Sequence, residues 1–258
     1  MAWRFQERIA FPAPRARIPD PPPQGLQDAE PITLTMADGT KLRGWYVPPF
    51  PRPSPSFPAL LWFYGNGETI GAIWPVLREF RPPRTALLVI DYPGYGSSEG
   101  RSTEAALYEA ADLAYAALAA RSGVDPGRVW VYGRSLGSVA ATHVAATRPV
   151  SGLVLESPFT SARDMARRHY APFPRFLIRL RLDNLAAITR VRCPVLVFHG
   201  TADRLAPLEM GQRVAAAVPG PVELVLIEGA GHNETYDVGG IAYRDKLWEF
   251  LQTGPWHG

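Results

Sequence analysis

The chain has 258 residues, 47% of them hydrophobic, and this length and composition predict one α/β domain with a sizeable core. Its net charge is only +3 and its basic residues are dispersed along the chain, which excludes the concentrated basic surface of a nucleic-acid-binding protein. The single cysteine excludes an internal disulfide and a cysteine-based metal site, so we expect a reducing compartment, the cytoplasm.

The first 31 residues combine apolar side chains with a proline-rich run and are predicted to form an extended arm over the surface of the domain. Charges and prolines interrupt every apolar stretch in this arm, so we expect neither a signal peptide nor a membrane anchor. Residues 32–47 alternate around Asp38-Gly39, a pattern typical of a β-hairpin with a tight turn. The main domain is therefore expected to span residues 32–258.

After the hairpin, short apolar runs alternate with stretches of helical composition. Continuous apolar strands that are separated by helices predict a mostly parallel sheet with helices on both faces, entered through the antiparallel hairpin. Ligands of such sheets bind outside the carboxyl ends of the strands. The predicted strands are 60–63, 86–90, 129–132, 153–155, 195–198 and 222–227, and the predicted helices include 103–120, 138–147, 207–218 and 241–251.

The pattern Gly133-x-Ser135-x-Gly137 directly follows one predicted strand and directly precedes a predicted helix. The glycines remove Cβ atoms that would collide in such a sharp turn, so Ser135 is predicted to project from the carboxyl edge of the sheet as a nucleophile. A second match to the pattern, at 96–100, has no strand directly before it and no helix directly after it. Ser98 in that match is therefore interpreted as a loop residue.

His232 and Asp203 are predicted to complete a catalytic triad with Ser135. His232 follows the last predicted strand and a loop of small residues, so its imidazole, whose pKa suits proton transfer near neutrality, is expected above the same sheet edge. Asp203 follows the preceding strand and gives the chain order Ser, Asp, His. Glu156, at the end of another predicted strand, remains an alternative acid.

An acyl-transfer site also needs N–H donors for the oxyanion of the tetrahedral intermediate. The backbone N–H of Leu136, directly after the nucleophile, is one expected donor. The second is expected from Asn66, which lies between two glycines in the loop after the first predicted parallel strand. Tyr64 in the same loop, and Tyr95 in a second glycine-containing loop, are expected to line the substrate pocket.

Together, these motifs resemble those of the α/β-hydrolase fold serine hydrolases, and the resemblance runs from residue 32 to the C-terminus. It is strongest to the small-capped branch, which includes depalmitoylase-like and peptidase-like esterases. Members of that branch usually have a histidine at the position of Tyr64, a difference that concerns the oxyanion loop and leaves the triad intact. The motifs that carry the resemblance are Tyr64-Gly65-Asn66-Gly67, Asp91-Tyr92-Pro93-Gly94-Tyr95-Gly96, Gly133-Arg134-Ser135-Leu136-Gly137, His199-Gly200-Thr201-Ala202-Asp203 and Gly231-His232.

The resemblance also implies that an insert at about 158–192, which mixes arginines with apolar side chains, forms a small lid over the active site. One hypothesis is that Phe176 and Leu177 receive an acyl chain while the arginines face water or an anionic headgroup. The other hypothesis is a packed helix pair with a solvated basic face.

We predict a hydrolase that cleaves small-molecule carboxylic esters or thioesters through an acyl-enzyme, with no cofactor and no metal. A peptidase of the same fold remains an alternative. So does a non-catalytic protein that keeps the triad geometry but only binds a small molecule, because one fold supports unrelated functions.

Overall fold

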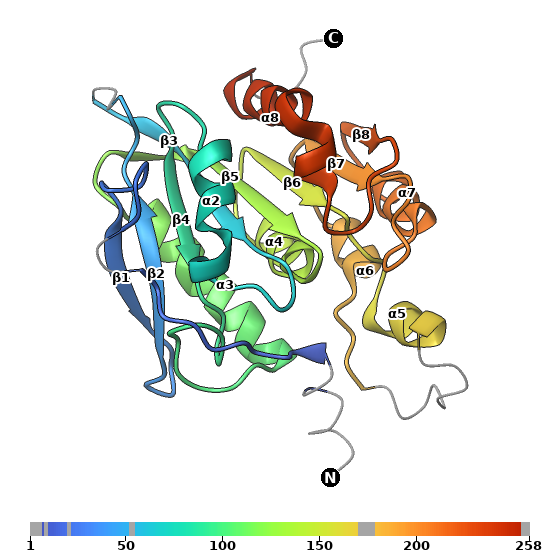
Figure 1. Ribbon diagram of the computed structural model, residues 1–258, viewed down its shortest axis with the longest axis horizontal. Coiled ribbons are helices and arrows are strands. Elements are labelled where there is room, and N and C mark those ends of the chain that lie inside the picture. Colours follow the sequence, from blue (N-terminus) through green and yellow to red (C-terminus); the bar gives the residue numbers. More distant parts are fainter. Residues whose placement is uncertain (1–6, 8–9, 20–21, 52–54, 170–178, 254–258) are drawn as a thin grey trace.

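An eight-stranded sheet forms the centre of the computed structural model, which describes residues 7, 10–19, 22–51, 55–169 and 179–253. The strands lie in the order β1-β2-β4-β3-β5-β6-β7-β8 (Figure 1). β2 is antiparallel to both β1 and β4, and the remaining neighbours are parallel. The strand bounds are β1 Glu30–Thr35, β2 Lys41–Val47, β3 Phe57–Phe63, β4 Ala86–Ile90, β5 Val124–Arg134, β6 Gly152–Glu156, β7 Val195–Gly200 and β8 Val222–Ile227.

Helices cover both faces of the sheet. α2 and α8 lie on one face and contact each other through aromatic rings, whereas α3, α4, α6 and α7 lie on the other (Figure 1). Every residue of β4, β6 and β7 is buried, which explains why these strands are apolar in sequence up to Glu156 in β6 and His199 in β7. The helix bounds are α2 Ile70–Phe80, α3 Glu104–Ala119, α4 Leu136–Thr147, α5 Ala162–His169, α6 Asn184–Ile188, α7 Leu208–Ala216 and α8 Thr235–Thr253.

The predicted sheet and its antiparallel start are confirmed. Outside the insert at about 158–192, which contains α5 and α6, two helices differ from the prediction. α2 was not predicted, and it contains Pro75, which denies the helix one N–H donor and disguises it in the sequence. α8 begins at Thr235 instead of residue 241, because two helical segments join across a kink at Gly240, whose φ is 50°. The predicted helix corresponds to the segment after that kink.

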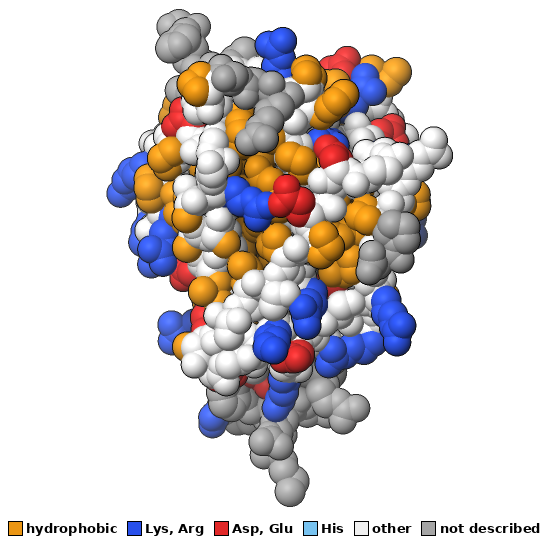
Figure 2. Space-filling view, turned by 90° about the vertical axis from the view of Figure 1, so that its left-hand side faces the viewer, with side chains coloured by type: hydrophobic (Ala, Val, Ile, Leu, Met, Phe, Trp, Pro, Cys, Tyr) orange, Lys and Arg blue, Asp and Glu red, His pale blue; other side chains and the backbone are white. Residues whose placement is uncertain are grey.

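The N-terminal hairpin side of the molecule carries charges of both signs. Figure 2 shows this side, with Lys and Arg side chains separated by acidic and hydrophobic ones. Arg121 pairs with Glu30 of β1 and lies 3.8 Å over the ring of Tyr46 in β2. In the part of the chain that is described, no helix is both long and apolar enough to cross a membrane.

Candidate active site

Ser135 lies in a sharp turn between the end of β5 and the start of α4. Its φ is 48° and its ψ is −112°, a left-handed backbone conformation that is strained for a residue with a side chain. The flanking glycines make the turn sterically possible. A Cβ on Gly133 would lie 2.4 Å from the carbonyl oxygen of Gly137, and a Cβ on Gly137 would lie 2.3 Å from that of Phe63.

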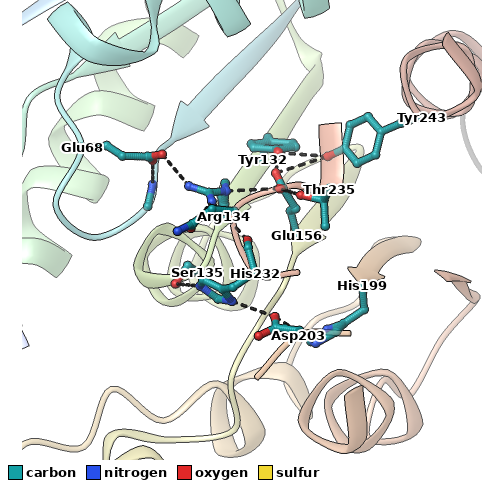
Figure 3. A network of polar contacts seen from close by, with 12 residues as sticks. Glu68, Tyr132, Arg134, Ser135, Glu156, His199, Asp203, His232, Thr235 and Tyr243 are labelled. Carbon is teal, nitrogen blue, oxygen red and sulfur yellow. Dashed lines mark hydrogen bonds and ion pairs between the residues drawn. The ribbon is translucent and has the colours of Figure 1, made fainter. Parts of the chain in front are cut away.

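The structure brings the three predicted triad residues together at the carboxyl edge of the sheet (Figure 3). His232 Nε2 lies 2.8 Å from Ser135 Oγ, and His232 Nδ1 lies 2.7 Å from Asp203 Oδ2. Both distances are within hydrogen-bond range. A neutral imidazole with its proton on Nδ1 fits this arrangement, because Nε2 is then free to accept the serine proton.

Asp203 is held by the backbone of its own turn. Its Oδ1 accepts hydrogen bonds from the N–H groups of Leu205 and Ala206, at 2.9 and 2.8 Å, which leaves Oδ2 for His232. Burial alone would raise the pKa of Asp203, but the hydrogen bond and charge of His232 and the Ala206 N–H outweigh it and lower that pKa. The aspartate therefore stays ionised, the state that orients an imidazole and stabilises its cation.

The alternative acid, Glu156, contacts other groups. It is fully buried at the end of β6, where its carboxylate accepts hydrogen bonds from Arg134 and from the hydroxyls of Tyr132 and Thr235. Of the two candidate acids, Asp203 is the one bonded to His232.

His199 packs against the turn that contains Asp203 and stabilises it. Its Nε2 lies 2.8 Å from the carbonyl oxygen of Ala206, and its ring packs so closely on α7 that a Cβ on Gly211 would lie 2.3 Å from Nδ1. Burial lowers the pKa of His199 below that of an ordinary histidine, so the ring is neutral at neutral pH. This histidine is a structural part of the loop that presents Asp203.

The loop after β3 holds the predicted oxyanion donor Asn66. The side chain of Asn66 is fixed at both ends, since Oδ1 accepts from the Tyr95 hydroxyl at 2.6 Å and Nδ2 donates to the Ala10 carbonyl at 2.9 Å. Leu136 is the first residue of α4, where N–H groups have no partner within the helix. That these two N–H groups bind an oxyanion stays a prediction.

The two tyrosines predicted to bind substrate lie inside the protein. Tyr64 is 1% exposed and its hydroxyl donates to Asp91 at 3.0 Å, while Tyr95 is 0% exposed and bonds Asn66. Both hydroxyls thus support the loops of the site from within, and a contact with substrate stays a prediction for both. Phe176 and Leu177 lie outside the described residues.

The sequence interpretation missed Arg134, the residue directly before the predicted nucleophile Ser135. It forms ion pairs with Glu68 and Glu156 and hydrogen bonds to the loop of His232 (Figure 3). Its position in the sequence could have indicated this role, because Arg134 is a charged residue in a motif that otherwise predicts a buried apolar strand and a tight turn. Such a charge is rarely buried unless it is paired.

Comparisons with known proteins agree with this fold. Residues 58–187 match a protein-family model described as alpha/beta hydrolase fold. An uncharacterized protein of Mycobacterium tuberculosis strain H37Rv is 34% identical over 253 residues, which cover 96% of this chain and 88% of that protein. The alpha/beta hydrolase domain-containing protein 17B of Homo sapiens is 35% identical over 164 residues, which cover 62% of this chain and 54% of that protein.

Solved structures show the same architecture at low sequence identity. An esterase of Pyrococcus furiosus superposes with a TM-score of 0.75 at 19% identity and covers 94% of this chain and 99% of the esterase. An acetyl xylan esterase from Paenibacillus sp. R4 superposes with a TM-score of 0.72 at 20% identity and covers 87% of this chain and 83% of that enzyme. The family match and the near full-length relative show that this chain belongs to the α/β hydrolase fold family.

Proposed function

We propose that this protein is a serine hydrolase that cleaves carboxylic esters or thioesters through an acyl-enzyme. The observation that carries the proposal is the chain of contacts from Ser135 Oγ through His232 to Asp203, at 2.8 and 2.7 Å. A strained serine with a base in hydrogen-bond range, and an acid that orients that base, is the arrangement that activates a hydroxyl. Two proteins of the same fold are esterases, so the fold accommodates this reaction.

In the proposed reaction, Ser135 Oγ attacks the carbonyl carbon of the substrate while His232 Nε2 takes the hydroxyl proton. The backbone N–H groups of Leu136 and Asn66 bind the oxygen that becomes negative. The tetrahedral intermediate collapses, the bond to the alcohol or thiol breaks, and His232 protonates the leaving group. Water, deprotonated by His232, then attacks the carbonyl carbon of the acyl-enzyme. The bond to Ser135 Oγ breaks, and His232 returns its proton to that oxygen, which releases the carboxylic acid and free Ser135.

A series of p-nitrophenyl esters of increasing acyl length tests the reaction class, with Ser135→Ala as the loss-of-function variant. We expect kcat of the variant to fall by about 10⁴-fold or more. Ser151→Ala is a matched control, because Ser151 directly precedes β6, at the end of that strand opposite to Glu156, and its hydroxyl bonds the Gly127 carbonyl. The control is expected to retain the wild-type kcat.

A fluorophosphonate probe adds a measurement that does not depend on the natural substrate. It is expected to label the wild type and Ser151→Ala at Ser135 and to leave Ser135→Ala unlabelled. Turnover of peptide substrates but not of esters would favour a peptidase instead. Thermal stabilisation by an ester analogue, without labelling or turnover, would favour a protein that only binds.

A further inference from the structure

Arg134 lies between the loops that hold the site together. Its side chain is 3% exposed, and its guanidinium faces the loop after β3, the end of β6 and the loop before α8 (Figure 3). An arginine guanidinium presents five N–H donors in one rigid plane, so a single group of this kind fixes several acceptors relative to one another. Because Arg134 is the neighbour of Ser135 in the chain, these acceptors are fixed relative to the nucleophile.

One side of the guanidinium holds the loop of the base. Arg134 Nη2 donates to the backbone carbonyl oxygen of His232 at 3.2 Å and to Asn233 Oδ1 at 2.7 Å. The first of these acceptors belongs to the residue whose imidazole contacts Ser135 Oγ. A shift of Arg134 would therefore move the imidazole relative to the serine.

The other side of the guanidinium holds the loop that carries the expected oxyanion donor. Arg134 Nη1 lies 2.5 Å from Glu68 Oε1, and Glu68 Oε2 accepts the N–H of Gly65 at 2.6 Å. Gly65 immediately precedes Asn66, whose N–H is the proposed donor. A Cβ on Gly65 would lie 2.7 Å from Arg134 Nη1, so the loop and the guanidinium are in close contact.

Glu156 at the end of β6 also holds the guanidinium of Arg134 in place. Its Oε1 lies 3.2 Å from Arg134 Nε and also accepts from Thr235, the first residue of α8, while Tyr132 and Tyr243 bond its other oxygen. Removing two charges from water is costly, and a buried ion pair is weak evidence for stability. The arrangement is better explained by what it holds in place, since its partners come from segments far apart in the sequence.

We propose that Arg134 is a positioning residue that sets both the His232 imidazole and the oxyanion loop relative to Ser135. The inference rests on the proposed function. Its two arms act on different parts of the reaction: the Asn233 arm on proton transfer and the Glu68 arm on binding of the oxyanion. Lysine, a point charge on a flexible stem, cannot replace the planar group.

The test compares Arg134→Lys, Glu68→Ala and their double variant, with kcat expressed per site titrated by the fluorophosphonate. Arg134→Lys is expected to lower kcat by about 10²-fold without changing KM, the size of loss that small misplacements cause. Because Arg134 acts on the loop of Asn66 through Glu68, the two losses overlap, and the double variant is expected to lose less than the sum of the two single losses in free energy. Additive losses in the double variant, or a wild-type kcat per titrated site in Arg134→Lys, would overturn the proposal.

The pH profiles of kcat separate positioning from simple loss of stability. Asn233→Ala is expected to shift the acid limb of the profile, because it loosens the loop of the base, whereas Glu68→Ala lowers the whole profile without moving it. Arg148→Lys is the matched control, since Arg148 pairs with Asp112 just after the opposite end of α4 and is expected to keep the wild-type kcat and profile. Identical profiles for all variants would leave Arg134 a merely structural residue.

If Arg134→Lys fails to fold, the double variant Arg134→Met/Glu156→Gln takes its place. This variant removes both buried charges together, so neither is left unpaired. It is expected to show the same loss of kcat. A measurement without turnover completes the design. The ring resonances of His232, assigned by comparison with His232→Gln, are expected as one sharp set in the wild type and as broadened or doubled signals in the Arg134 variants. A wild type without esterase activity overturns the proposed function, whereas unchanged His232 resonances overturn the role of Arg134.

Discussion

The hydroxyl of Tyr64 donates a hydrogen bond to Oδ1 of Asp91, 3.0 Å away, inside the protein. Asp91 is 0% exposed, and its carboxylate also accepts from the N–H groups of Ile70 and Ser97. Burial raises the pKa of Asp91, and these donors act against that rise. Tyr64 thus joins the loop after β3 to the 91–98 loop.

Tyr64→Phe removes one of these donors from a buried carboxylate. We expect the free energy of unfolding to fall by about 1–3 kcal/mol, because the acceptor loses its partner without gaining water. Urea unfolding measures the change. Tyr108→Phe, which removes a bond to the partly exposed Glu104, is the control and is expected to lose less. An equal loss in both variants would contradict the special role of the buried pair.

Asp203→Asn tests which acid serves His232. We expect kcat to fall by about 10⁴-fold, because the asparagine no longer stabilises the imidazolium and favours the wrong tautomer. Asp237→Asn is the matched control, since Asp237 is exposed on α8 although it is close to His232 in the sequence. Steady-state kinetics on a p-nitrophenyl ester would refute the assignment if both variants kept the wild-type rate.

Gly137→Ala tests the packing of the Ser135 turn against the end of β3 and the loop that follows it. The new Cβ would stand 2.3 Å from the carbonyl oxygen of Phe63 and 2.6 Å from that of Tyr64, so the backbone must shift. We expect a loss of about 1–3 kcal/mol in stability together with reduced kcat. Gly220→Ala, whose Cβ would meet no atom within 4 Å, is expected to match the wild type in thermal unfolding and in turnover.

The stability of the protein is expected to fall as the pH drops below about 6.5, the pKa of an unfolded histidine. His199 has its pKa lowered by burial, so in this range the unfolded chain binds a proton that the folded protein does not. Asp203 also has a lowered pKa, but its stabilisation is lost only below the ordinary aspartate range, near 3.8. The pH range in which His199 affects stability is therefore separate from the lower pH range in which Asp203 does.

Urea unfolding between about pH 5 and 8, where an ordinary histidine titrates, measures the slope. His199→Gln keeps a donor for the Ala206 carbonyl but has no titrating group, so its stability is expected to change less over this range. A slope as steep as that of the wild type would assign the effect to another group.

Most of the sheet could be predicted because β4, β6 and β7 are buried on both faces and are therefore mostly apolar in sequence, with polar residues only near the carboxyl ends of β6 and β7. The helix bounds were harder. Pro75 argues against a helix in the sequence of α2, so α2 was not predicted. Gly240 divides α8 into two parts, and only the second has an evident helical pattern in the sequence. Local sequence signals fail where tertiary packing decides the conformation.

In the candidate site, too, some features could be predicted from the sequence and others could not. The place of Ser135 could be predicted because steric demands on its turn fix the neighbouring glycines. The contacts of Arg134 could not, since Glu68, Glu156 and Asn233 are spread over the chain and only the folded protein makes them neighbours. The glycines beside Ser135 mark its turn locally in the sequence, whereas no local pattern identifies the partners of Arg134.

The backbone of Ser135 has a further consequence for the balance between activity and robustness. A φ of 48° is favourable for glycine and strained for a residue with a Cβ atom. Ser135→Gly is therefore expected to be more stable than Ser135→Ala by about 1 kcal/mol or more in thermal unfolding. Serine also carries a Cβ, so Ser135→Gly is likewise expected to unfold at a higher temperature than the wild type. Selection for thermal stability alone would favour glycine at this position, so the presence of a serine there indicates that its hydroxyl is retained for a role other than stability.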